Sequence, residues 1–99
     1  MPNDSTIALR PRFQSGHIAA TPGAVDLLQG DMKLAALLLA RHLSGDSGDT
    51  CEEDKAINED AIKYGNRVMS VYKLVGGEVL WVITERDRSV TTFLLPEEY

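Results

Sequence analysis

Residues 42–54 gather most of the side chains that could do chemistry in this 99-residue chain. A histidine, a serine and a cysteine stand there among five carboxylates: His42, Asp46, Ser47, Asp49, Cys51, Glu52, Glu53 and Asp54. Carboxylates and a histidine can hold a divalent cation, and a serine or cysteine with a histidine base can act as a nucleophile. An active site in this segment is therefore the first hypothesis.

The residues around Ser47 match a short stretch of known catalytic serines. Gly45-Asp46-Ser47-Gly48 has the same four residues that surround the nucleophile of chymotrypsin-like proteases. Such a serine also needs a histidine base, an orienting acid and an oxyanion hole brought together by a scaffold. Four matching residues supply none of these, so the match does not predict a serine hydrolase.

A cation site would use His42, Asp46, Asp49 and Glu53. The calcium-loop pattern D-x-[DN]-x-[DN]-G is absent, because two residues, Ser47 and Gly48, separate the first two aspartates. Asp and Gly at these positions are otherwise typical of a turn, and acids after it suit the positive end of a helix. We expect no catalytic residue, metal or cofactor here. A small metal-dependent nuclease toxin that uses these four residues is the alternative.

Negative charge is concentrated in the second half of the chain. The formal charge is −5; residues 1–45 carry four bases and three acids, whereas residues 46–99 carry six bases and twelve acids. Seven acids lie within residues 46–60, with Lys55 as the single base: Asp46, Asp49, Glu52, Glu53, Asp54, Glu59 and Asp60. This segment would repel a phosphate backbone, so we expect no direct binding of nucleic acid.

The composition is that of an ordinary folded protein. Hydrophobic residues make up 43% of the chain and charged residues 25%. The longest apolar run, residues 34–40, is far shorter than the ~20 residues of a membrane-spanning helix. The chain does not open on a secretory signal, and its single cysteine cannot form an internal disulfide. We expect a cytoplasmic protein that does not bind a membrane.

Local start and stop signals predict three helices. Thr21 before Pro22 begins a short one, and Asp31 caps a second whose middle is apolar nearly all round, so that it should be buried on most sides. Thr50 and Glu53 fit a capping box at the start of a third. The predicted helices span residues 22–29, 32–43 and 51–64.

After residue 67 the pattern changes to strands. The runs at 68–74, 79–84 and 89–95 are rich in β-branched and aromatic residues, with Gly76-Gly77 as a hairpin turn and residues 85–88 as a second turn. These runs predict a three-stranded antiparallel meander, and residues 17–20 are a candidate extra strand. We expect an α+β domain over residues 17–99, with two to three N-terminal helices on this sheet and a polar tail or loosely docked edge over residues 1–16.

The middle strand of the predicted meander is apolar on both faces. Val79, Trp81 and Ile83 alternate with Leu80 and Val82. Helices can cover one side of the sheet. The other side then needs the N-terminal segment or a second subunit, and the second of these alternatives would be a homodimer through the sheet.

Two blocks of the sequence resemble a family of small proteins. His42 to Asp49 matches a His-x-Ser-Gly-Asp-x-Gly-Asp block, in which the family usually has Trp at the position of Ser47, and Ile83 to Ser89 matches an Ile-Thr-Glu-x-Asp-Arg-Ser block. The chain resembles, from about Phe13 to Tyr99, plasmid-related proteins of mobile elements that are often labelled toxins of type I toxin–antitoxin pairs. Type I toxins are generally short membrane peptides, and this chain has no apolar segment of that kind. The resemblance therefore implies a mobile-element context.

Charge and resemblance together favour binding without catalysis. The acidic segment, and also the turn formed by Glu85, Arg86, Asp87 and Arg88, would contact a basic protein of the host, such as a defence or regulatory component with a basic nucleic-acid groove. Clustered carboxylates compete with phosphates for arginine and lysine. The predicted partner-binding residues are Asp46, Asp49, Glu52, Glu53, Asp54, Glu59, Asp60, Glu85, Arg86, Asp87 and Arg88.

Overall fold

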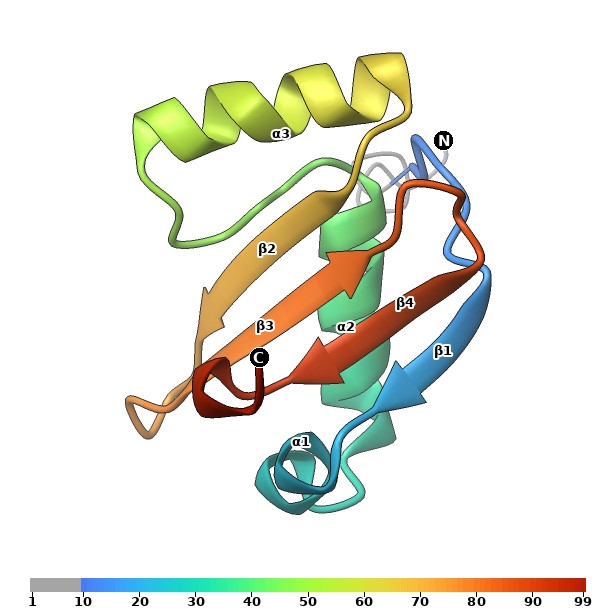
Figure 1. Ribbon diagram of the computed structural model, residues 1–99. Coiled ribbons are helices and arrows are strands. Elements are labelled where there is room, and N and C mark those ends of the chain that lie inside the picture. The colour runs from blue at the N-terminus through green and yellow to red at the C-terminus, as the bar shows by residue number, and fades with distance from the viewer. Residues whose placement is uncertain (1–9) are drawn as a thin grey trace, which may run out of the picture.

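The β-rich runs form one sheet together with the short N-terminal strand (Figure 1). The computed structural model describes residues 10–99. Its sheet has the order β1-β4-β3-β2, with antiparallel pairing between β2 and β3 and between β3 and β4, and parallel pairing between β1 and β4. The strands are β1 (His17–Ala20), β2 (Val68–Lys73), β3 (Val79–Thr84) and β4 (Val90–Leu94).

The predicted three-stranded antiparallel meander is therefore wrong, because the sheet has four strands and is mixed. β1 lies beside β4, with His17 opposite Val90 and Ala20 opposite Phe93. No hairpin joins these two strands, and three helices and the strands β2 and β3 lie between them in the chain. A local turn signal cannot indicate such a pair, so its parallel direction depends on how the helices return the chain to the sheet.

The helices are α1 (Pro22–Leu28), α2 (Met32–Leu43) and α3 (Glu52–Tyr64), and a short turn of 3-10 helix, η2 (Pro96–Glu98), lies near the C-terminus. Thr21 accepts the Ala24 amide at 3.3 Å, and Asp31 accepts the Leu34 amide at 3.0 Å, as N-caps should. None of the described helices is long and apolar enough to cross a membrane.

The capping box predicted for α3 does not form. Cys51 is the N-cap residue and gives no side-chain cap. The Thr50 hydroxyl bonds the Ser47 hydroxyl at 2.7 Å instead. The pattern correctly predicted that a helix begins here, but the Thr50 hydroxyl bonds within the preceding loop instead of capping the helix.

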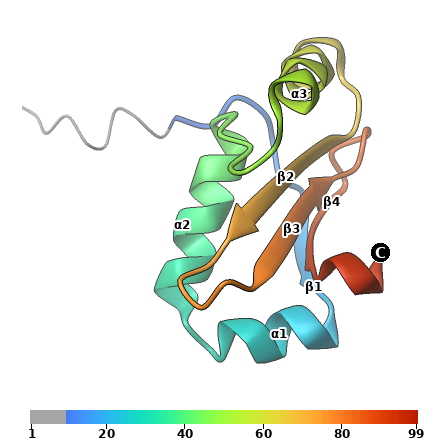
Figure 2. The ribbon, with the colours of Figure 1, turned by 90° about the vertical axis from the view of Figure 1, so that its left-hand side faces the viewer.

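The core lies between α2 and one face of the sheet (Figure 2). Its buried side chains come from α1, α2 and three strands: Ala24, Leu38, Tyr72, Leu80, Val82 and Phe93. The expectation that α2 is buried on most sides is wrong. Leu38 is buried, but Leu37 is 48% exposed and Met32 is 75% exposed, because the helix covers a single sheet from outside.

The second face of the sheet carries the C-terminal turn rather than the N-terminal segment. η2 follows β4 onto this face, and the Tyr99 ring packs edge-on against Trp81, with ring centroids 5.5 Å apart. The N-terminal segment is held elsewhere: the Arg12 amide donates to the Leu43 carbonyl at 2.7 Å, and the Thr91 hydroxyl donates to the Ser15 carbonyl at 2.8 Å. The earlier part of the predicted tail, residues 1–9, lies outside the described residues.

Candidate functional site

The loop at residues 46–49 pairs with the outer edge of the sheet. The Val71 amide of β2 donates to the Ser47 carbonyl at 3.0 Å, and the Asp49 amide donates to the Val71 carbonyl at 2.7 Å. The Asp49 side chain continues the pairing by accepting the Lys73 amide at 2.9 Å. The loop thus covers the free backbone groups of an edge strand. The acid and glycine residues of this loop therefore serve to hold it against β2.

Asp46 is engaged within the molecule as well. Arg41 donates to its carboxylate at 2.8 Å and lies over the Tyr72 ring, 4.7 Å from the centroid. The hydrogen bond from Arg41 lowers the pKa of Asp46, and the Gly48 amide at 3.0 Å adds to this. Asp46 is therefore already paired with a cation of its own chain.

His42 lies inside the protein, away from the acidic loop. Its side chain is fully buried, with Nδ1 2.7 Å from the Ser70 hydroxyl and Nε2 2.8 Å from the Thr84 hydroxyl. The Thr84 hydroxyl is also 2.6 Å from that of Thr91. Burial lowers the pKa of His42 to about 4, and the positive charge of Arg88 contributes. Both ring nitrogens are used internally, so His42 is a core residue.

The proposed nuclease cluster is not assembled in the described part of the chain. Within residues 10–99, no three His, Cys, Asp or Glu side chains come together as a metal site. The Ser47 hydroxyl bonds Thr50, and the Ser47 side chain is nearly buried. His42, Asp46, Asp49 and Glu53 therefore have no shared space in which a cation or a substrate could meet them.

The turn at residues 85–88 is held against the body of the protein. Arg88 donates to the Asn66 carbonyl at 2.6 Å and to the Ala61 carbonyl at 3.2 Å, and it lies 5.1 Å from the Phe13 ring centroid. Glu85 is 3.9 Å from Arg67. Arg88 thus joins the turn to the C-terminal end of α3 through hydrogen bonds. Arg86 and Asp87 remain exposed at the tip.

The acids of α3 differ in how they are used. Glu59 forms a two-pronged ion pair with Arg12, at 2.8 and 3.0 Å, which lowers its pKa. Glu52 is 3.6 Å from Lys55 and its side chain is 93% exposed. Three further acids of the helix are exposed and form no ion pair with residues of the described chain: Glu53, Asp54 and Asp60.

Two exposed apolar side chains of α3 were missed by the sequence analysis. Ile57 is 60% exposed and Tyr64 is 67% exposed, and Lys63 lies 5.3 Å from the Tyr64 ring centroid. Only Asn58 and Ala61 of this helix are buried. Asn58 bonds the Met69 backbone through both side-chain atoms, at 2.5 and 3.2 Å. Helical spacing could have indicated the exposed pair, because residues seven apart share a side.

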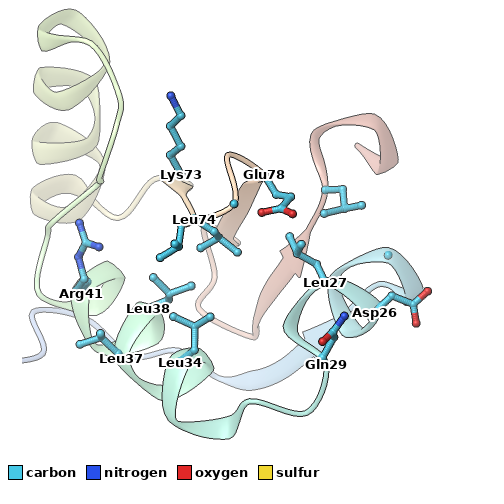
Figure 3. Close-up of a pocket in the computed structure, with 14 residues that line it drawn as sticks. Asp26, Leu27, Gln29, Leu34, Leu37, Leu38, Arg41, Lys73, Leu74 and Glu78 are labelled. Carbon is cyan, nitrogen blue, oxygen red and sulfur yellow. The ribbon is translucent and has the colours of Figure 1, made fainter.

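A hollow of about 750 Å³ opens between α1, α2 and the β2–β3 turn (Figure 3). Its floor is leucine, with Leu27, Leu34, Leu38 and Leu74 labelled in the close-up. Of the predicted site residues, none lines it. Arg41 reaches its rim but is paired with Asp46. Asp26, Lys73 and Glu78 also line the hollow, but no histidine, serine or cysteine of the described residues does, so it has an apolar floor with charged sides and no catalytic arrangement.

Comparison with known proteins adds no relative to this description. A scan against models of protein families found no match, and searches among curated proteins and among solved structures found no similar protein. The resemblance to plasmid-related proteins stays a prediction from the two sequence blocks.

Proposed function

We propose that this is a non-enzymatic protein of a mobile element that binds a basic host protein, of the defence or regulatory class, through the exposed side of α3. The observation that carries the proposal is a set of unpaired acids beside exposed apolar side chains on one helix. The docking stripe, as we name it, consists of Glu53, Ile57, Asp60 and Tyr64.

The docking stripe follows helical geometry. Its members lie four, three and four residues apart, so they share one side of α3. The buried residues Asn58 and Ala61 hold another side of the helix against the sheet. A partner would therefore meet two acids and two apolar anchors without disturbing the packing of the helix.

Acids outside the docking stripe are less suited to a partner. Asp46, Asp49 and Glu59 already bond Arg41, the Lys73 amide and Arg12. Breaking these contacts would offset part of what a new contact gains. Free carboxylates attract a basic surface at long range, and buried apolar anchors supply most of the affinity at short range.

The support for binding rather than catalysis is geometric. An acidic helix whose side chains face solvent can dock on a basic groove as it stands. The nuclease alternative requires His42 to leave a buried site in which Ser70 and Thr84 hold both of its ring nitrogens. Nothing in the described structure favours that rearrangement.

Affinity capture from a host lysate tests the proposal with matched variants. The bait is the full chain, and the test variant carries Glu53→Gln with Asp60→Asn. The control carries Glu78→Gln with Glu97→Gln, which removes the same charge from exposed acids outside α3. We expect the test variant to lose basic proteins that the control retains.

The captured protein is then purified and titrated directly. Removing two acids from the docking stripe should weaken binding about tenfold and reduce its dependence on salt. Ile57→Ala and Tyr64→Ala should each weaken binding and leave the salt dependence unchanged. If the charge variant and its control capture the same proteins with equal affinity, the proposal is wrong.

A further inference from the structure

The two edges of the sheet differ in whether other parts of the chain bond their backbone groups. The outer edge of β2 is closed, because the loop at residues 46–49 and the Asn58 side chain bond its backbone. The outer edge of β1 is open, since all four of its residues are exposed and no described element covers them. Figure 1 shows β1 at the end of the sheet opposite β2.

The open edge presents free backbone groups. The His17 amide donates to the Ser89 carbonyl at 2.9 Å, and the Thr21 amide donates to the Phe93 carbonyl at 3.0 Å, so these odd-numbered residues face β4. Backbone groups alternate in direction along a strand, which turns those of Ile18 and Ala20 outward. This edge contains no lysine, proline or acid to discourage pairing.

An apolar groove runs along the open edge. A hollow of about 290 Å³ lies between β1 and α2, and a second of about 200 Å³ continues it toward α1. Ile18 is 50% exposed, Val25 is 54% exposed and Met32 is 75% exposed along this groove. The one charged side chain lining either hollow is Asp31, whose carboxylate caps α2.

We propose that a second copy of this chain occupies the β1 edge and its groove. Two β1 strands would pair antiparallel across a two-fold axis, and each α2 would cover part of the other's exposed apolar side. The sequence offered a homodimer through a face of the sheet as one of two ways to cover that face, whereas the geometry points to the edge. This interaction does not depend on the docking stripe of α3.

Closure and charge both favour a second copy. Each chain has one open edge and one closed edge, so pairing through β1 ends at a dimer and cannot extend into a filament. The acidic helix α3 lies near the closed β2 edge, as Figure 1 shows, so two copies with a charge of −5 would meet away from the acids of α3. A stable interface buries about 800 Å² per partner, which four residues of strand cannot supply, so the groove must be part of it.

Sedimentation velocity over about a hundredfold range of concentration tests the proposal. A reductant is present, because Cys51 is free and exposed. We expect a reversible dimer for the native chain. Ile18→Lys and Met32→Lys should each raise the dissociation constant at least about tenfold. Val75→Lys is the matched control, because Val75 is a fully exposed apolar residue at the β2–β3 turn, and it should leave the dimer unchanged.

Every outcome of these measurements supports or overturns the proposed dimer. A native chain that stays monomeric throughout the range overturns the proposal, and so does a dimer that Ile18→Lys and Met32→Lys leave intact. Met32 is the more exposed of the two, so its variant keeps the fold even where the Ile18 variant loses it. Circular dichroism of every variant, compared with the native chain, separates lost pairing from lost folding.

Discussion

Acid should destabilise this protein through one buried histidine. His42 is fully buried, and its two ring nitrogens meet the Ser70 and Thr84 hydroxyls. Burial lowers its pKa from the ordinary 6.5 to about 4. Between these two pH values the unfolded chain binds a proton at this residue and the folded chain does not. The free energy of unfolding therefore falls as the pH falls through this window.

The pKa difference sets the size of the effect. A shift from 6.5 to about 4 corresponds to a loss of about 3 kcal/mol between pH 7 and pH 4. The steepest slope is about 1.4 kcal/mol per pH unit. For a domain of this size, that is a large part of a total stability of about 5 to 10 kcal/mol.

Urea unfolding at a series of pH values measures this slope. His42→Gln keeps a hydrogen-bonding side chain but cannot take up the proton, so the slope between pH 6.5 and 4 should be much smaller in this variant. His17→Gln makes the same replacement at the other histidine of the chain, on exposed β1, and serves as the comparison. Asp46 and Glu59 are paired acids whose pKa values are lowered. The stability that they contribute is therefore lost only at still lower pH, in all three proteins. Equal slopes for the native chain and His42→Gln, or NMR titration of the His42 ring near its ordinary pKa, would refute the reasoning.

Two substitutions test how the β2 edge is closed, both by urea unfolding at pH 7. Gly48→Ala should destabilise the protein by about 2 kcal/mol or more, because Gly48 has φ +74° and an added Cβ would overlap the Val71 carbonyl oxygen. A loss below about 0.5 kcal/mol would contradict the role given to this loop. Asn58→Ala should cost about 1 to 3 kcal/mol by leaving the Met69 amide and carbonyl without their partner. Asn58→Asp keeps the acceptor for the Met69 amide but turns a carboxylate oxygen toward the Met69 carbonyl, so it should cost at least as much as Asn58→Ala; a clearly smaller loss would contradict the two-bond description.

The elements with local signals could be predicted from the sequence. The caps at Thr21 and Asp31 and the glycine turn at residues 76–77 act over a few residues, and the structure has α1, α2 and the β2–β3 hairpin at these places. α3 also begins where the charge and turn pattern indicated, although its predicted capping box is absent. Such signals suffice because the hydrogen bonds they describe join residues close in sequence.

The candidate site could be predicted only in part. Charge clustering indicated the acids of residues 46–60 but gave no sign of which carboxylates bond to other parts of the chain. Glu59 meets Arg12 across 47 residues, and Asp49 meets the Lys73 amide across 24 residues. These partners are brought together by the fold, so the sequence pattern could not separate them from Glu53 and Asp60.

The amino-acid sequence by itself determined the three helices, the hairpin and the acidic character of α3, because each depends on neighbouring residues. Tertiary structure alone decided that β1 runs parallel beside β4, that the loop at 46–49 closes the β2 edge, and that His42 is a core residue. Each of these depends on backbone or side-chain groups far apart in the chain. The physical reason is that edge pairing and burial are properties of the assembled sheet, which no short stretch of sequence contains.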